Sequence, residues 1–191
     1  MKESRIAVRY AKALFELSLE QNNLEQTNQD MLLVSSVCKQ NKDFRYMLSS
    51  PIIKTDKKQK IIKSIFGEKI NALSLAFLNI ISLKRREILI DQIATQFLAL
   101  YHDYKGILPV HLTTASDSDE EIRSVVKQIV NKFTQKEILL MEEIKKDILG
   151  GFILRFGQYQ YDDSIRNKIM KLKREFNVNI ITTVPNVKYK A

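Results

Sequence analysis

The chain has 191 residues, of which 45% are hydrophobic and 28% are charged, the balance of a folded globular protein rather than a disordered one. The formal net charge of +9 makes nucleic acid, an acidic membrane face and an acidic protein candidate partners. The single cysteine, Cys38, excludes an intramolecular disulfide. The longest uncharged run, residues 70–83, is too short to span a bilayer, so we expect a soluble protein that can still sit against a membrane complex.

The first 105 residues are dominated by apolar side chains at helical spacing. In residues 4–20, Tyr10 and Leu14 lie on an apolar stripe, and Ala7 and Ala11 lie beside it, where another backbone could approach closely. The chain has only five glycines and three prolines, which favours long elements over turns. We therefore predict a bundle of about six helices, which span residues 4–20, 24–40, a short piece near 44–48, 55–66, 70–83 and 86–104.

Three residues are predicted to mark helix ends. Thr55 can cap the fourth helix, and Gly67 is placed to terminate it. Gly106 is expected to stop the sixth helix. The period of the apolar residues changes after Gly106, so a domain boundary is predicted between residues 105 and 106.

Residues 70–83 differ from the other helices because their apolar residues surround the whole circumference. A helix that is apolar on every side must be covered on every side. Either this helix is central in the bundle, or one of its faces waits for a partner.

Residues 106–191 are predicted to form a smaller α/β domain. Leu108, Val110 and Leu112 alternate as in a strand, with Pro109 at an edge position or at the strand's start. Gly150 and Gly151 are expected to form a tight turn. The other predicted elements are a helix opened by a capping box at 118–121, strands near 138–144 and 152–156, a helix from 162–164 to about 176, and a further strand at 178–184.

No catalytic, cofactor-binding or metal-binding constellation is present in the sequence. There is no phosphate loop, and one cysteine with two histidines cannot supply a structural zinc site. His102 and His111 are interpreted as surface residues. The lysine- and arginine-rich runs are interpreted as solvated helix faces, with no cofactor and no metal expected.

Binding is therefore the more promising class of function. Nucleic acid is the natural competitor because of the charge, but there is no tryptophan and the other aromatic residues fall mostly on apolar stripes. The stronger feature is the apolar surplus of residues 70–83 beside the alanine-bearing first helix. Two such helices can form a groove for an amphipathic helix, although burial within the bundle itself explains the pattern equally well.

These segments together resemble one family along essentially the whole chain, the delta subunit of bacterial and chloroplast ATP synthase, which is similar to the mitochondrial oligomycin-sensitivity-conferring protein. The resemblance is carried by the order and spacing of several short motifs. They are residues 7–15 (AVRYAKALF), residues 47–53 (MLSSPII) with Lys57 and Lys60, residues 77–81 (FLNII) followed by Arg85 and Arg86, residues 149–152 (LGGF), Gly157, and residues 162–165 (DDSI).

The resemblance implies a function without chemistry, that of a stator connector. In the family, the N-terminal bundle binds the N-terminal helices of alpha subunits in the catalytic head, and the C-terminal domain holds the b-type subunits of the peripheral stalk. It implies a place at the cytoplasmic face of the cell membrane, peripheral and within the complex. It also places the alpha-binding groove on the first and fifth helices, where the candidate lining residues are Ala7, Tyr10, Ala11, Leu14, Phe77, Leu78 and Ile81.

Two alternatives remain open from the sequence. One is a basic helical adaptor that binds nucleic acid or ribosomal components, whose affinity would fall steeply with ionic strength. The other is a small enzyme whose site forms only with a partner.

Overall fold

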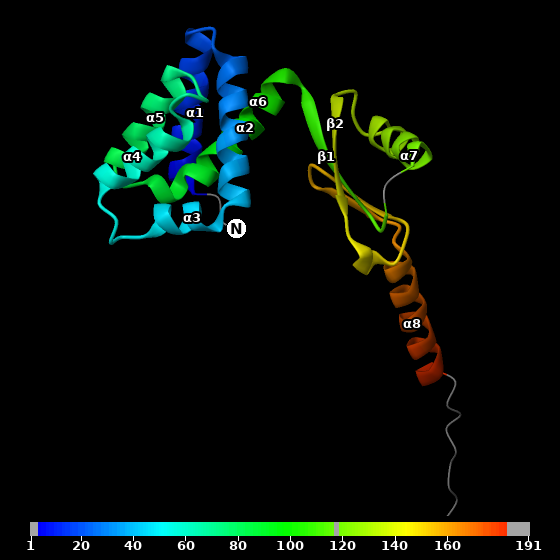
Figure 1. The fold of residues 1–191 in the computed structure, drawn as a ribbon. Coiled ribbons are helices and arrows are strands. Elements are labelled where there is room, and N and C mark those ends of the chain that lie inside the picture. Colours follow the sequence, from blue (N-terminus) through cyan, green and yellow to red (C-terminus); the bar gives the residue numbers. More distant parts are fainter. Residues whose placement is uncertain (1–3, 117–118, 183–191) are drawn as a thin grey trace, which may run out of the picture. The chain divides into compact units, whose positions relative to one another are not determined.

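The structure of the chain is a computed structural model that describes residues 4–116 and 119–182. It divides into two compact units, Met1–Lys105 and Gly106–Ala191. The first unit is helical and the second combines helices with a sheet, as Figure 1 shows. The expectation of a mainly α chain is thus confirmed.

Six α-helices and one turn of 3-10 helix make up the described part of the first unit. The sequence predicted one last helix from about residue 86. The structure has two helical elements there, η1 and α6, so the described part of this unit has seven helical elements where about six were expected. The elements are α1 (Arg5–Glu20), α2 (Leu24–Gln40), α3 (Lys42–Ser49), α4 (Thr55–Phe66), α5 (Ala72–Leu83), η1 (Glu87–Leu89) and α6 (Ile90–Lys105).

The core of this unit is built around α6, which packs against both α1 and α2, while α4 packs against α5. Ala7 and Ala11 of α1 are fully buried, and so are Ala94 and Phe97 of α6. Small residues let two helix backbones approach closely, and the Phe97 ring meets the ring of Phe15 on α1 edge to face. The contact between α1 and α6 therefore combines buried alanines with an aromatic pair.

Side-chain caps define two of the helix starts. The side-chain oxygen of Asn41 accepts a hydrogen bond from the Phe44 amide at 3.0 Å, and that of Asn71 accepts one from the Ser74 amide at 2.7 Å. Each cap satisfies one of the amides that a helix N-terminus leaves unpaired. The prediction that Thr55 caps α4 was wrong, because Thr55 is the first helical residue and Lys54 occupies the cap.

The predicted glycine stops lie where they were expected, with different backbone conformations. Gly67 follows α4 in a right-handed conformation with a φ of −54°, so it ends the helix without the left-handed turn typical of a glycine cap. Gly106 lies between α6 and the first strand with a φ of +69°, a value that L side chains rarely adopt.

The described part of the second unit holds a four-stranded mixed sheet with strand order β2-β1-β3-β4. β1 is parallel to β2 and antiparallel to β3, and α7 connects the two parallel strands. The elements are β1 (Ile107–Thr114), α7 (Glu120–Asn131), β2 (Glu137–Ile144), η2 (Lys146–Ile148), β3 (Phe152–Phe156), β4 (Tyr159–Asp162) and α8 (Ile165–Thr182).

A small apolar core joins one face of the sheet to α7. Val110 and Leu112 of β1 pack with Leu154 of β3, and Val126 and Val130 of α7 cover them. Because side chains alternate along a strand, Leu139 and Met141 of β2 face the opposite side of the sheet, where they remain partly exposed. One face of the sheet is therefore covered by α7 and the other presents apolar side chains.

Several local predictions in this unit need correction. β1 is a central strand, so the edge position considered for Pro109 is wrong. Pro109 does lie near the start of the strand, in the part that pairs with β2 alone, where a missing amide is tolerated. β4 was not predicted. The strand expected at 178–184 is wrong as far as residue 182, because α8 continues to that residue. Residues 183 and 184, and Ser118 of the predicted capping box, lie outside the described residues.

Candidate functional site

The outer face of α5 is apolar and exposed. Ala72, Ala76, Ile80 and Leu83 are exposed, with half of Ile80 accessible, and no charged residue occurs within Ala72–Leu83. The opposite face buries Leu78 and Ile81 with Ser74 and Ser82. The question left open by the sequence is thereby answered, because this helix is not central in its bundle and one apolar face stays uncovered in the described structure.

On α1 the exposed apolar residues flank the buried stripe. Ala7, Ala11 and Leu14 are buried, whereas Ile6 and Leu17 each expose 38% of their surface. The apolar stripe predicted from the sequence is therefore buried at Leu14 and partly exposed at Ile6, Tyr10 and Leu17. The reason is that α6 packs against α1, so the smallest side chains occupy the closest approach.

Tyr10 and Phe77 bring the exposed faces of α1 and α5 together. Their rings meet edge to face, with 6.3 Å between centroids. Arg86 donates a hydrogen bond to the Tyr10 hydroxyl at 3.1 Å, and its guanidinium carbon lies 5.6 Å from the Tyr10 ring centroid. Aromatic pairs of this geometry stabilise a contact beyond the area they bury, so the two exposed apolar faces form one surface.

The seven residues predicted to line a groove separate into two sets. Tyr10 and Phe77 are half-buried and lie at the surface between α1 and α5. The other five expose 2% or less and belong to the interior of the unit, which leaves them almost no surface to offer a partner; they are Ala7, Ala11, Leu14, Leu78 and Ile81. A glutamate at Ala11 would therefore disrupt the unit's own core before it could test a groove.

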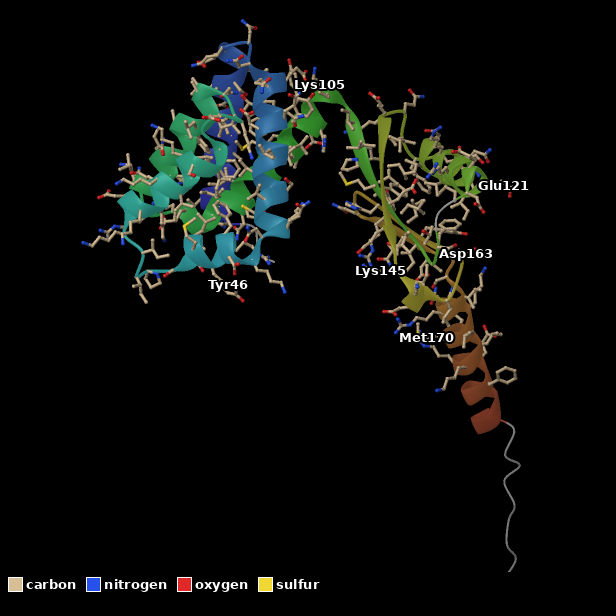
Figure 2. The ribbon with its side chains drawn as sticks, in the orientation of Figure 1. Tyr46, Lys105, Glu121, Lys145, Asp163 and Met170 are labelled. Atoms are coloured by element: carbon tan, nitrogen blue, oxygen red, sulfur yellow. The ribbon has the colours of Figure 1, made fainter. Side chains whose placement is uncertain are left out.

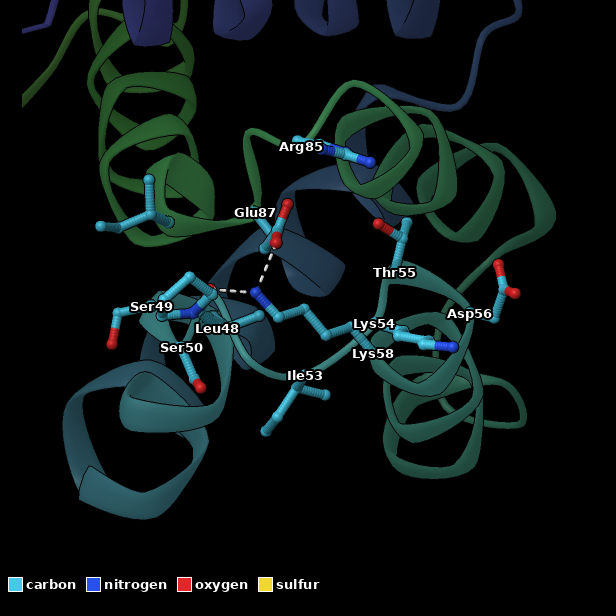
Figure 3. A pocket seen from close by; sticks show the side chains of 12 residues that line it. Leu48, Ser49, Ser50, Ile53, Lys54, Thr55, Asp56, Lys58, Arg85 and Glu87 are labelled. Carbon is cyan, nitrogen blue, oxygen red and sulfur yellow. Dashed lines mark hydrogen bonds and ion pairs between the residues drawn. The ribbon is translucent and has the colours of Figure 1, made fainter.

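Lys58 is a buried lysine that the sequence reading treated as part of a solvated basic run. The residue is 3% exposed, and its ammonium lies 2.5 Å from Glu87 Oε1 and 2.8 Å from the Leu48 carbonyl oxygen. Figure 3 shows the two interactions. The ammonium thus caps the C-terminal end of α3 while Glu87 supplies the opposite charge.

The position of Lys58 had a signal in the sequence. It lies four residues before Ile62 and eight before Phe66, and all three are buried on one face of α4. A lysine on the apolar stripe of a helix requires a buried carboxylate or carbonyl partner. The basic composition of the surrounding run concealed that requirement.

A second polar cluster fastens the end of α6 to the start of α2. Glu25 accepts a hydrogen bond from the Tyr101 hydroxyl and pairs with Lys105, each at 2.5 Å. The Lys105 ammonium, followed by Tyr101, lowers the pKa of Glu25, and the bond to Glu25 raises the pKa of both Tyr101 and Lys105. The cluster holds the last turn of α6, immediately before Gly106.

In the second unit, Gly150 and Gly151 form a turn between η2 and β3, with φ values of +153° and +71°. A Cβ at Gly151 would lie 2.4 Å from the Asp163 carbonyl oxygen. The Ile165 amide donates to the Gly150 carbonyl at 3.0 Å. The turn therefore packs directly against the start of α8.

The start of α8 is fixed by side-chain hydrogen bonds. The Ser164 hydroxyl donates to Asp162 Oδ1 at 2.6 Å and accepts from the Asn167 amide at 3.2 Å. Asp162 Oδ1 also accepts from the Ser164 amide at 3.0 Å. Residues 162–165 thus act as a cap for α8, a structural role that needs no chemistry.

The face of α8 carries an exposed apolar stripe. Its residues recur every three or four positions and each exposes between 44% and 65% of its surface; they are Ile165, Ile169, Leu172 and Phe176. Met170 projects from the same helix (Figure 2). Residues 166–176 include five basic residues and one acidic residue. A stripe flanked by charges is typical of a helix that pairs with another helix.

Within the residues that the structure describes, no group of three His, Cys, Asp or Glu side chains is placed to hold a metal ion. Cys38 is buried, and burial raises the pKa of its thiol to about 12, which disfavours the reactive thiolate. Burial also lowers the pKa of His102, which is partly covered on α6. No helix among the described residues is long and apolar enough to cross a membrane.

Comparison with known proteins gives a consistent result. Residues 6–176 match the family described as ATP synthase delta (OSCP) subunit. The chain is 35% identical to ATP synthase subunit delta of Cytophaga hutchinsonii over 95% of its length and 99% of that protein. It is 32% identical to ATP synthase subunit delta of Christiangramia forsetii over 94% and 97% of the two chains.

A solved structure shares the fold. A chain in the cryo-EM structure of the Toxoplasma gondii mitochondrial ATP synthase hexamer superimposes with a TM-score of 0.69 at 21% identity. The match covers 91% of this chain and 98% of that one. It therefore includes both the helical unit and the unit with the sheet.

Proposed function

The chain belongs to the ATP synthase delta (OSCP) subunit family, and we propose that its helical unit docks on the catalytic head while its second unit holds the peripheral stalk. As a delta subunit it is a structural component of the peripheral stalk of F-type ATP synthase and not the catalytic subunit. The alternative of a nucleic-acid-binding adaptor has no support from these relatives.

The observation that carries the head contact is the uncovered apolar surface of α1 and α5. Ile6, Tyr10 and Leu17 supply one side of it, and Phe77 and Ile80 supply the other. An amphipathic helix lying along this surface would cover apolar groups that the unit itself leaves exposed. We propose the N-terminal helix of an alpha subunit as the occupant, an assignment supported by the family resemblance, which implies an alpha contact on these two helices.

The supporting argument for the stalk contact is the exposed stripe of α8. Ile169, Leu172 and Phe176 form a seam of the kind that a second amphipathic helix covers. The surrounding basic residues favour a partner helix with acidic flanks. The C-terminal helix of a b-type subunit is the occupant we propose, with the open face of the sheet around Leu139 and Met141 as an adjoining contact.

In this role the protein resists torque and catalyses no reaction. Long-lived apolar contacts at both ends resist the drag of the rotor, so that proton-driven rotation changes the catalytic sites instead of turning the head. The proposal places the chain at the cytoplasmic face of the cell membrane, peripheral and within the complex.

Co-purification from native membranes tests this division of roles. The tagged full chain should bring down alpha and b-type subunits together. A fragment ending at Lys105 should fold as a helical domain, retain the alpha subunits and lose the b-type subunits. A fragment that folds but retains only the b-type subunits would reverse the assignment.

A further inference from the structure

The helical unit has a hollow surface that the proposed contacts do not use. Two adjacent pockets of about 620 and 410 Å³ open beside α3, the 50–54 segment and the start of α6. They share Leu48, Ser49 and Ile88 as lining residues, so they adjoin each other. We name the pair the α3–η1 hollow, and Figure 3 shows its larger part.

The floor of the α3–η1 hollow contains buried acceptors that lack donors. Glu87 is 7% exposed, and while its Oε1 pairs with Lys58, its Oε2 accepts no hydrogen bond from the described residues. Asp91 Oδ1 and Gln92 Oε1 are buried in the smaller pocket and equally lack a donor there. Each of these atoms has less than 1 Å² of accessible surface, so an occupant of the hollow would contact the rim and the exposed side chains rather than these acceptors.

The rim of the hollow has the opposite character. Lys42 and Arg45 border the smaller pocket, and Lys54 and Arg85 border the larger one. All four are exposed, and Asp56 is the one acidic residue on the rim of the larger pocket. Arg85 has a φ of +54° at the end of α5, a position where glycine is usual. Arg85 therefore places a cation at a position whose backbone conformation favours glycine.

Exposed apolar residues complete the surface. Ile88 is 61% exposed and contributes to both pockets, and Tyr46 is 70% exposed beside the smaller one. Tyr46 projects outward from α3 in Figure 2. Aromatic and large aliphatic side chains beside charged groups are the composition expected at the centre of a protein contact.

We propose that the α3–η1 hollow is a second docking site, which receives an acidic segment of another ATP synthase subunit. Carboxylates of that segment meet the cations of the rim, and its apolar side chains cover Ile88 and Tyr46. A basic segment does not fit, because it would meet four exposed cations. A ligand that carries charge alone does not fit either, because it would leave Ile88 and Tyr46 uncovered. The proposal rests on the function proposed above, since it assumes that the chain works within that complex.

Site-specific photo-cross-linking in the assembled complex tests the proposal. The photoreactive phenylalanine derivative p-benzoylphenylalanine would replace Tyr46 or Ile88 in the hollow, Ile80 in the α1–α5 groove, and Leu32 on α2 as a control. All four native side chains are at least 48% exposed, so each probe should be tolerated. We expect probes at Tyr46 and Ile88 to capture a segment with net negative charge. The yield should drop about tenfold when Lys54 and Arg85 are both changed to Glu, with capture from Ile80 unchanged.

The outcomes separate this inference from the proposed function. Capture of an alpha subunit from Ile80 with none from Tyr46 or Ile88, or capture there of a basic segment, would overturn the second site and leave the first intact. Absence of capture from Ile80 as well would count against the proposed function itself. A yield from Ile88 that equals the yield from Leu32 would also overturn the second site, because it would show contact without selectivity.

Discussion

The ring of Tyr10 meets the ring of Phe77 edge to face, with 6.3 Å between centroids and 72° between planes. This contact joins a helix near the beginning of the chain to one that lies more than 60 residues later. The exposed apolar residues of α1 and α5 become one continuous surface because the two rings fasten these helices together.

Removal of the Phe77 ring should lower the affinity of the α1–α5 surface for its proposed ligand. In Phe77→Ala, the lost contact with Tyr10 and the lost apolar area should reduce binding of a synthetic alpha N-terminal helix by about 2 kcal/mol, measured by calorimetry. Tyr10→Phe is the matched control, because it keeps the ring pair and removes only the bond to Arg86. It should change the binding free energy by less than about 1 kcal/mol. Equal losses in the two variants would contradict a ring-based surface.

Loss of Lys58, which pairs with Glu87, should lower the free energy of unfolding far more than loss of any other lysine on α4. Lys58→Met leaves the Glu87 carboxylate buried without its partner, which should lower the free energy of unfolding by about 3–5 kcal/mol in denaturant titrations. Lys57→Met, on the exposed side of the same helix, should change it by less than about 0.5 kcal/mol. Restoration of much of the loss in Lys58→Met with Glu87→Leu would confirm the cause. If Lys58→Met were as stable to denaturant as Lys57→Met, the buried Lys58–Glu87 pair could not be a main source of stability.

Two glycines with similar left-handed backbones, Gly151 and Gly157, allow the cost of a steric clash to be separated from the cost of backbone strain. Gly151→Ala places a Cβ 2.4 Å from the Asp163 carbonyl and should destabilise the second unit by about 3 kcal/mol. Gly157 has a φ of +52° and nothing lies within 4 Å of the position that a Cβ would take, so Gly157→Ala should cost only the backbone strain of about 1 kcal/mol. Thermal unfolding followed by circular dichroism would compare them. Equal losses would mean that the turn does not pack tightly against α8.

The Glu25–Tyr101–Lys105 cluster should be sensitive to pH at both extremes. The pKa of Glu25 is lowered in the folded state, so its contribution to stability is present above pH 4.5 and is lost as the pH falls below that value. The pKa values of Tyr101 and Lys105 are raised, so their contribution is present below about pH 10 and is lost as the pH rises further.

Glu25→Gln should therefore flatten the dependence of the unfolding free energy on pH in both windows, below 4.5 and above 10. The measurement is a series of urea titrations at fixed ionic strength from pH 3 to pH 11. An unchanged pH profile in Glu25→Gln would show that the cluster does not contribute to stability.

Periodicity in the sequence located the helices of the first unit well, because each has an apolar stripe at helical spacing. Periodicity did not predict which residues of these helices are buried and which are exposed. Ile6 and Leu17 of α1 are exposed although they are strongly hydrophobic, whereas Ala7 and Ala11 are fully buried because α6 packs closely against α1. The prediction of a groove on α1 and α5 was therefore made partly from residues that face inward.

The second unit was harder to predict because its elements are short and their partners lie far apart in the sequence. β4 has four residues, and its pairing with β3 depends on a tight turn at Gly157 rather than on any apolar run. The β-branched residues after Asn177 favour a strand by propensity, whereas the structure continues α8 to Thr182. Local propensity is overridden in such segments by what precedes them, here the firmly capped start of α8.

The most direct test of the account is binding of the alpha N-terminal helix to two variants that differ only in where a charge is placed. Ile80 on α5 and Leu32 on α2 expose 50% and 48% of their surfaces, so a glutamate at either position should be tolerated by the fold. Calorimetric titration should show at least about a 30-fold loss of affinity for Ile80→Glu and an unchanged affinity for Leu32→Glu. Normal binding by Ile80→Glu, with its helical circular dichroism spectrum retained, would contradict the assignment of this surface to the catalytic head.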